Sequence, residues 1–208
     1  FFVSAERLRD PSLIGRPVAV GGTGPRAVLS SASYEARKFG VRSAMPTAQA
    51  LRLCPQLVVV KSNYGLYTEL SGAVFEIVEK YTPIVERVSV DEAYMDMTGT
   101  EPLHGPPLTA AAKLRAEIRE KTRLPASIGI AANRGVAKIA TDQAKPDGQL
   151  WVKPGQEAAF LAPLPVGVIP GVGPATQKWL HERGFFKISD LQSARPETLE
   201  GALGESGG

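Results

Sequence analysis

Two adjacent carboxylates, Asp91 and Glu92, are the residues of this chain best suited to chemistry. Short apolar-rich runs flank the pair closely on both sides, which predicts a bend between two neighbouring strands. Adjacent carboxylates repel each other and are tolerated best in water or beside cations. Their oxygens suit a hard cation such as Mg²⁺, so metal-assisted chemistry on a phosphate is the first hypothesis. An ordinary acidic hairpin turn without a metal is the alternative.

Tyr34 and Arg37 form a second candidate group, because residues three apart on a helix share one face. The sequence around them predicts a short helix over residues 34–39, closed by Gly40. A guanidinium can bind two phosphate oxygens at once, and a phenol can donate one hydrogen bond. The pair could therefore bind phosphate groups. A solvated surface cation is the competing interpretation for Arg37, as it is for Lys145.

Charge is distributed unevenly along the 208 residues, although the net charge is only +3. Residues 1–62 carry nine Lys and Arg against three Asp and Glu, whereas residues 63–100 carry two against seven. Residues 101–152 are basic again, with eight against five. This succession favours a cation site flanked by surfaces for a polyanion, with ordinary solvated charge as the alternative.

The composition also excludes several classes of protein. No apolar run approaches the ~18 residues that a membrane span requires, so no membrane partner is expected. No basic stretch followed by an apolar segment opens the chain, so no secretory signal is predicted. Cys54 is the only cysteine, which excludes an internal disulfide and favours a reducing, cytoplasmic compartment. We interpret Cys54 as a small buried apolar residue.

The elements that must position these residues follow an α+β pattern. From residue 63 the predicted order is helix, strand, strand, helix, strand, helix, strand. The predicted helices cover residues 63–81, 109–122 and 133–144, and the last two strands cover 126–132 and 149–152. A strand ending at Phe1 and Phe2 would complete a sheet with helices on one face.

The sequence of residues 9–63 predicts a smaller unit of mixed strands and helices. Its strands are predicted at residues 17–20, 27–29 and 57–60. Thr47 is expected to cap a helix over residues 48–53, which Pro55 stops.

Prolines recur after residue 152, and the remaining chain predicts short helices. Gly171, Val172 and Gly173 precede a helix predicted over residues 175–183. Small residues at this place let the backbone turn tightly and point N–H groups outward from the helix start. The pattern resembles a helix-hairpin-helix loop that holds one DNA phosphate, with a plain packing turn as the alternative.

Four segments together resemble the Y-family (translesion) DNA polymerases, most closely the bacterial DNA polymerase IV type. They are residues 1–6, 33–42, 89–96 and 144–148, whose order and spacing fit the family from end to end. The resemblance implies a right-hand layout. Its ferredoxin-like palm, an antiparallel sheet with helices on one face, would comprise residues 1–8 and 64–152. Small α/β fingers would comprise residues 9–63, and a helical thumb residues 153–208.

The resemblance also implies a two-metal centre. Asp91 would bridge two Mg²⁺ ions, and Glu92 would ligate the ion that lowers the pKa of the primer 3′-hydroxyl. Asp96 could be a further ligand, but its place along the second strand favours a structural hydrogen bond.

The nucleotide-binding residues are implied in the same way. The triphosphate of an incoming nucleotide would be bound by Ser31, Tyr34, Arg37 and Lys145. Phe2 would stack under the sugar and leave no room for a 2′-hydroxyl, an ordinary core phenylalanine being the alternative.

The function implied is template-directed addition of deoxynucleotides to a primer 3′-end. Fidelity would be low and damaged templates tolerated, because small fingers residues press little on the nascent base pair. The expected partners are primer–template DNA and a deoxynucleoside triphosphate, with a sliding clamp as a further candidate. The protein is expected to be a monomer in the bacterial cytoplasm, associated with the nucleoid.

Two expected parts of the family pattern do not occur in this sequence: an Asp-x-Asp just before Phe1, and a DNA-binding little-finger domain after the thumb. We therefore expect the isolated 208-residue chain to be inactive or nearly so and to bind DNA weakly. The main alternative is a polymerase-like accessory protein that binds DNA without chemistry, although such relatives usually lose the acidic pair. A palm-fold nucleotide cyclase would leave the loop at residues 171–173 and the Tyr34–Arg37 helix without a purpose.

Overall fold

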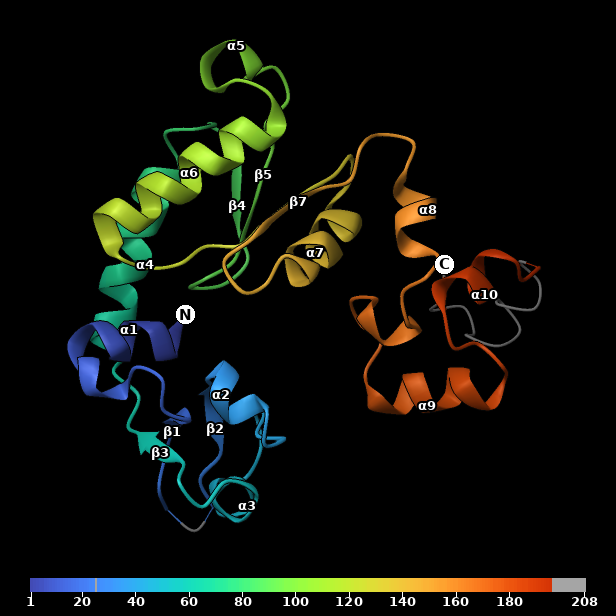
Figure 1. The fold of residues 1–208 in the computed structure, drawn as a ribbon. Coiled ribbons are helices and arrows are strands. Elements are labelled where there is room, and N and C mark those ends of the chain that lie inside the picture. The colour runs from blue at the N-terminus through green and yellow to red at the C-terminus, as the bar shows by residue number, and fades with distance from the viewer. Residues whose placement is uncertain (25, 196–208) are drawn as a thin grey trace. The chain divides into compact units, whose positions relative to one another are not determined.

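The computed structural model describes residues 1–24 and 26–195, so residues 196–208 of the expected thumb lie outside the described residues (Figure 1). The chain divides into two compact units. Unit 1 comprises Phe1–His104 and Ala116–Pro125, and unit 2 comprises Gly105–Arg115 and Ala126–Gly208. Helix α6 (Pro107–Thr122) contributes residues to both. The mixed helix and strand content confirms the α+β class.

A small sheet in the order β2-β1-β3 organises the first part of unit 1. Strand β1 (Val18–Gly21) pairs antiparallel with β2 (Leu29–Ala32) and parallel with β3 (Val58–Val60). Successive side chains of a strand face opposite sides of the sheet. Ala19 accordingly joins one buried cluster, while Val18 and Val20 join another. The sheet is therefore buried between two apolar cores.

The first core lies under helices α2 (Tyr34–Arg37) and α3 (Thr47–Leu53). Cys54 is fully buried in it, which confirms its interpretation as a small apolar residue. The expectation that Thr47 caps α3 is wrong. Its hydroxyl instead donates to the carbonyl oxygen of Gly22 at 2.8 Å, a contact between distant parts of the chain.

The second core is built by helix α1 (Phe2–Arg9), the short 3₁₀ turn Pro11–Leu13 and helix α4 (Tyr64–Val78). The predicted strand ending at Phe1 and Phe2 is wrong, because α1 begins at Phe2. The backbone N–H of Ala5 donates to the carbonyl oxygen of Phe1 at 2.9 Å and closes the first helical turn. Asn63 caps α4 by accepting from the backbone N–H of Leu66.

An antiparallel hairpin follows α4 in unit 1, as the sequence predicted. Strand β4 (Val85–Arg87) pairs with β5 (Ala93–Met95), and residues 88–92 connect them. Helix α5 (Glu101–His104) comes next.

Unit 2 contains a parallel pair, β6 (Ile128–Ile130) and β7 (Gln149–Trp151), connected by helix α7 (Arg134–Gln143). Asn133 caps α7 as predicted, by accepting from the backbone N–H of Val136 at 2.9 Å. The helical crossover returns the chain in its original direction, so these strands pair in parallel rather than antiparallel. Gly129 lets β6 approach α7 closely, because a Cβ there would lie 2.2 Å from the carbonyl oxygen of Ala137.

The described part of the chain after β7 is helical, as predicted. It contains α8 (Glu157–Leu161), a 3₁₀ turn (Val166–Val168), α9 (Pro174–Glu182) and α10 (Ile188–Gln192). Val166 is fully buried, and its N–H donates to the carbonyl oxygen of Phe186 at 3.0 Å. Among residues 1–24 and 26–195, no helix combines the length and apolarity needed to cross a membrane.

Candidate active site

The acidic pair lies in the connection between β4 and β5, where Asp91 is exposed. The hydroxyl of Ser89 donates to Oδ1 of Asp91 at 2.9 Å, and the backbone N–H of Asp91 donates to that hydroxyl at 3.3 Å. The backbone N–H groups of Val88 and Ser89 both donate to the carbonyl oxygen of Glu92. Local hydrogen bonds thus fix the turn, and the Asp91 carboxylate is left in contact with solvent.

The donor set of this turn fits Mg²⁺ shared with a phosphorylated substrate. Asp91 and Glu92 offer carboxylate oxygens, the ligands that Mg²⁺ prefers, and Mg²⁺ typically uses only one or two carboxylates together with waters and substrate phosphates. Within the described residues, no group of three or more His, Cys, Asp or Glu side chains could hold a metal ion. A closed metal cage made only of the described side chains is therefore not the arrangement here.

Asp96 has the structural role that its place in the sequence favoured. Its Oδ1 accepts from the backbone N–H of Thr98 at 2.9 Å. Hydrogen bonds from the Thr98 side chain and backbone hold the pKa of Asp96 below its ordinary value.

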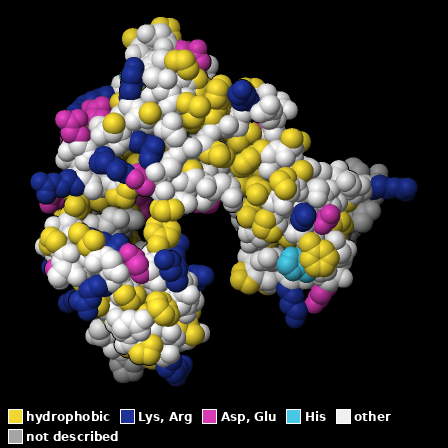
Figure 2. Space-filling model, in the orientation of Figure 1, with side chains coloured by type: hydrophobic (Ala, Val, Ile, Leu, Met, Phe, Trp, Pro, Cys, Tyr) yellow, Lys and Arg dark blue, Asp and Glu magenta, His cyan; other side chains and the backbone are white. Residues whose placement is uncertain are grey.

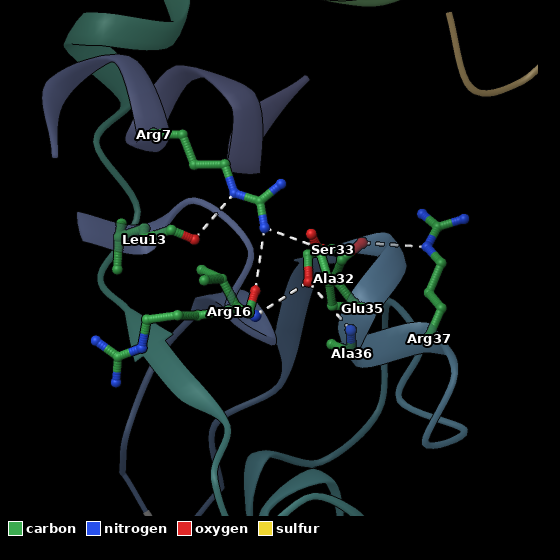
Figure 3. Close-up of polar contacts among 9 residues, drawn as sticks. Arg7, Leu13, Arg16, Ala32, Ser33, Glu35, Ala36 and Arg37 are labelled. Atoms are coloured by element: carbon green, nitrogen blue, oxygen red, sulfur yellow. Dashed lines mark hydrogen bonds and ion pairs between the residues drawn. The ribbon is translucent and has the colours of Figure 1, made fainter. Parts of the chain in front are cut away.

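Helix α2 is fixed to the sheet by a serine that sequence reasoning did not single out. The Ser33 hydroxyl accepts from the backbone N–H of Ala36 at 3.1 Å (Figure 3). It also accepts from the backbone N–H of Val18 at 3.0 Å. Ser33 is buried, and Ala36 is fully buried in the core. The signal was present, since serine is a preferred residue immediately before a helix.

Tyr34 and Arg37 lie close together on α2, as their spacing predicted. The Arg37 guanidinium carbon lies 5.4 Å from the centroid of the Tyr34 ring, and Tyr34 is 48% exposed. Nε of Arg37 donates to the carbonyl oxygen of Ala32 at 3.1 Å (Figure 3). Its terminal Nη atoms have no acceptor among the described residues, and Ser31 lies on the adjoining strand β2. This arrangement can present two guanidinium nitrogens and a phenol to an anion.

The surface around Tyr34 and Arg37 carries basic side chains, as expected from the excess of Lys and Arg in residues 1–62. In the space-filling view, Lys and Arg side chains lie over the region of α2, α3 and β1–β3 (Figure 2).

Phe2, the first residue of α1, stacks on the ring of Tyr67, with 4.4 Å between centroids and 23° between planes. The Tyr67 hydroxyl donates at 2.6 Å to the fully buried carboxylate of Glu6. Burial, and then the hydrogen bond to Glu6, raise the pKa of Tyr67 to about 12. Tyr67 thus supports the Phe2 ring from α4. Sequence reasoning missed this role because helical spacing alone does not show which ring a buried tyrosine contacts.

Lys145 lies in unit 2, on the turn after α7, and is not a solitary cation. Its Nζ lies 2.7 Å from Oδ1 of Asp142. Arg115 fixes this turn, because its guanidinium donates to the backbone and side-chain oxygens of Asp147 and to the carbonyl oxygen of Ala126.

The loop before α9 turns tightly, as the sequence predicted. Gly171 has a φ of +93°, which a residue with a side chain rarely adopts. The N–H of Val172 donates to the carbonyl oxygen of Ile169, and that of Gly173 to that of Gly171. These two N–H groups are therefore already bonded within the loop. In the first turn of α9, the N–H groups of Ala175 and Thr176 have no acceptor among the described residues.

Comparison with known families gives two matches along the chain. The impB/mucB/samB family matches residues 1–142, and the IMS family HHH motif matches residues 154–185. The second match covers the predicted helix-hairpin-helix loop.

Similar proteins include DNA polymerase IV 2 of Mesorhizobium japonicum, which is 45% identical over 208 residues. That match covers 100% of this chain and 49% of the relative. DNA polymerase IV of Stenotrophomonas maltophilia is 47% identical over 209 residues, which cover 100% of this chain and 58% of the relative. The chain thus spans about half the length of the curated relatives it matches.

Solved structures agree with these sequence matches. The crystal structure of DinB from Sulfolobus solfataricus superposes with a TM-score of 0.90 at 31% identity, over 99% of this chain and 61% of that one. The insertion ternary complex of Dbh DNA polymerase superposes with a TM-score of 0.87 at 31% identity, with the same coverage. The chain belongs to the impB/mucB/samB family, and its resemblance to Y-family DNA polymerases of the DNA polymerase IV type is confirmed.

Proposed function

We propose that the protein carrying this chain is a template-directed DNA polymerase that adds deoxynucleotides to a primer 3′-end. The observation that carries this proposal is the 45–47% identity, over the whole chain, to proteins named DNA polymerase IV. The acidic pair is present on its hairpin, with Asp91 exposed and Glu92 partly buried, which favours chemistry over the accessory-protein alternative. Low fidelity and translesion synthesis in damage tolerance and DNA repair are part of the same proposal.

The proposed lobes follow the family layout: a palm at residues 1–8 and 64–152, fingers at residues 9–63 and a thumb from residue 153. The fingers would be the β2-β1-β3 sheet with α2 and α3, and the thumb would include α8, α9 and α10.

The reaction joins the primer 3′-oxygen to the α-phosphorus of the nucleotide. The hydroxyl proton passes to water, and the bond between the α-phosphorus and pyrophosphate breaks. Asp91 and Glu92 would hold two Mg²⁺ ions, and bound Mg²⁺ supplies charge stabilisation at the attacking and leaving oxygens. The carboxylates would fix the place of these cations, and thereby of the primer end and the nucleotide, on the hairpin.

Helix α2 would bind the triphosphate. The Nη atoms of Arg37 would donate to phosphate oxygens and the phenol of Tyr34 would donate one hydrogen bond, with the hydroxyl of Ser31 nearby. Because Ser33 and the Nε contact of Arg37 already fix these groups, little rearrangement would be needed when the nucleotide binds. Lys145 would also bind a phosphate of the nucleotide, after exchanging its contact with Asp142.

Phe2 would exclude ribonucleotides. Its ring is supported from behind by Tyr67, so it could not easily move aside for a 2′-hydroxyl.

The loop at Gly171, Val172 and Gly173 would position a DNA phosphate at the start of α9. Its N–H donors would be those of Ala175 and Thr176, since the N–H groups of Val172 and Gly173 are already bonded within the loop.

The partners in this proposal are primer–template DNA and a deoxynucleoside triphosphate, with a sliding clamp as a further candidate. The protein would act as a monomer in the bacterial cytoplasm, on the nucleoid.

Primer extension by the full-length protein tests this function. Four primer–templates that differ only in the first template base are each offered all four deoxynucleotides singly, with Mg²⁺ present. We expect insertion of mainly the complementary nucleotide on each template. DNA binding without insertion on any template would support the accessory protein and contradict the polymerase.

A further inference from the structure

The guanidinium of Arg7 connects two helices of unit 1. It extends from α1 to α2, where Nη2 lies 2.9 Å from Oε2 of Glu35, 28 residues further along the chain (Figure 3). The same guanidinium donates to the carbonyl oxygens of Leu13 at 3.2 Å and Arg16 at 3.0 Å. Arg7 thus binds three acceptors, which its planar set of five donors permits.

This contact is stronger than an ordinary surface ion pair. The side chains of Arg7 and Glu35 are only 22% and 31% exposed, so water and salt screen their attraction less. Burial acts to raise the pKa of Glu35. Hydrogen bonds from its own backbone N–H, from Arg7 and from Ser33 outweigh that effect and hold the pKa below its ordinary value. The carboxylate is therefore ionised and bound to Arg7 near neutral pH.

The two connected helices carry the residues that the proposed function assigns to the nucleotide. Phe2 begins α1, and Tyr34 and Arg37 lie on α2 on either side of Glu35. A movement of α2 relative to α1 would change the separation between the sugar-facing ring and the triphosphate-binding groups. Helix α2 has only four residues, so it depends on contacts of this kind for its orientation.

Arg7 also compensates a charge. Glu35 places a carboxylate within two residues of Arg37, on the helix that would bind a polyanionic triphosphate. Without the guanidinium of Arg7, this carboxylate would repel the phosphates and compete with them for Arg37.

We propose that the Arg7–Glu35 ion pair positions α1 and α2 relative to each other. It would thereby fix the distance between the Phe2 ring, which selects the sugar, and Tyr34 and Arg37, which bind the triphosphate. This inference rests on the proposed polymerase function. Arg7 and Glu35 act through the groups that touch the nucleotide and do not themselves bind it.

A purely local role is the competing interpretation, because Arg7 also ties down the carbonyl oxygens of Leu13 and Arg16. The substitution Glu35→Gln separates the two roles. It removes the charge that connects the helices and leaves both carbonyl contacts of Arg7 in place. Glu69→Gln, at an exposed glutamate of α4, is the matched control for loss of one negative charge.

The test is single-nucleotide insertion by the full-length protein, with KM and kcat measured separately for a deoxynucleotide and for the matching ribonucleotide. For Glu35→Gln we expect the deoxynucleotide KM to rise about three- to tenfold with kcat within about twofold. The preference for deoxyribose should change in the same variant, whereas Glu69→Gln should match the unaltered protein in every value.

The double variant Arg7→Met/Glu35→Gln decides whether the two residues act as one unit. We expect its KM to be no higher than that of Arg7→Met alone, because the interaction is already lost and the uncompensated carboxylate is removed. The proposal would be overturned if the KM increases of Arg7→Met and Glu35→Gln multiplied in the double variant. It would also be overturned if Glu35→Gln had the same kinetic values as Glu69→Gln. Absence of insertion by the unaltered full-length protein would instead overturn the polymerase function, and this inference with it.

Discussion

Helix α2 and the β4–β5 hairpin carry the two halves of the proposed active site, and they are held in very different ways. Helix α2 rests on a buried alanine, Ala36, and its cap Ser33 bonds to strand β1 as well as to the helix itself. No residue of β4 or β5 is fully buried, and Ser89 is the only partner of the Asp91 carboxylate among residues 1–24 and 26–195.

The comparison shows that packing against the core orients α2 before any ligand binds, whereas the acidic hairpin would depend on bound ligands. The side chains of α2 that would bind the nucleotide start from a helix that one apolar core and an ion pair orient. The Asp91 carboxylate is oriented by a hydrogen bond within its own turn, and bound cations would offset the repulsion between it and Glu92. Changes at the hairpin should therefore affect chemistry without affecting folding, whereas changes under α2 should affect both.

Removal of divalent cations should give the largest effect. We expect a chelator to reduce insertion to background and added Mg²⁺ to restore it, because in the proposed function the acidic pair would act through bound cations. The melting temperature of the DNA-free protein should not change, since local hydrogen bonds already hold the hairpin. Insertion assays and thermal melts, each with and without chelator, measure the two effects. Insertion that persists after chelation would contradict a cation-dependent role for the hairpin.

Arg37→Ala should raise the deoxynucleotide KM by about 10–100-fold, the effect of losing charge-assisted hydrogen bonds to phosphate. The maximal rate at saturating nucleotide should change much less. Lys38→Ala is the matched control, because Lys38 lies next to Arg37 and is exposed. Steady-state insertion kinetics distinguish the two variants, and equal KM values for both would count against the role of Arg37.

Phe2→Ala should lower the preference for deoxyribonucleotides by about tenfold or more, because a bulky ring would no longer exclude the 2′-hydroxyl. Phe2→Tyr keeps a ring of similar size and should keep the preference. The ratio of kcat/KM for a deoxynucleotide and its ribonucleotide is the quantity to measure. An unchanged ratio in Phe2→Ala would contradict the role in sugar selection and support the interpretation of Phe2 as a core residue.

Two serines on one segment sharpen the comparison further. Ser33→Ala should destabilise the protein by about 1–2 kcal/mol, because a helix cap is lost and the N–H of Val18 loses its acceptor. Ser31→Ala should change stability by less than about 0.5 kcal/mol and instead raise the nucleotide KM. Urea unfolding measures the stability and insertion kinetics measure the KM. A loss of stability in Ser31→Ala with a raised KM in Ser33→Ala would contradict these assignments.

Local signals account for the parts of the fold that the sequence predicted. Asn133 capping α7 and the hairpin around Asp91 and Glu92 each depend on residues within a few positions of one another. The closeness of Tyr34 and Arg37 follows from helical spacing in the same way.

Contacts between distant residues account for the parts that it did not predict. The run of Phe1, Phe2 and Val3 has a strand-like composition, yet packing of Phe2 on Tyr67 accompanies a helix there. The hydroxyl of Thr47 bonds to the carbonyl oxygen of Gly22 rather than capping its own helix. The contact of Arg7 with Glu35 spans 28 residues and has no local signature.

The central claim is that Asp91 acts in chemistry and not in folding, and its comparison with Asp96 tests this most directly. Asp91→Asn and Asp96→Asn are each introduced into the full-length protein, and the insertion rate at saturating nucleotide is measured together with DNA affinity and melting temperature. We predict that Asp91→Asn abolishes insertion, leaves DNA affinity and melting temperature unchanged, and differs in rate from Asp96→Asn, which keeps insertion. Normal insertion by Asp91→Asn would contradict the account.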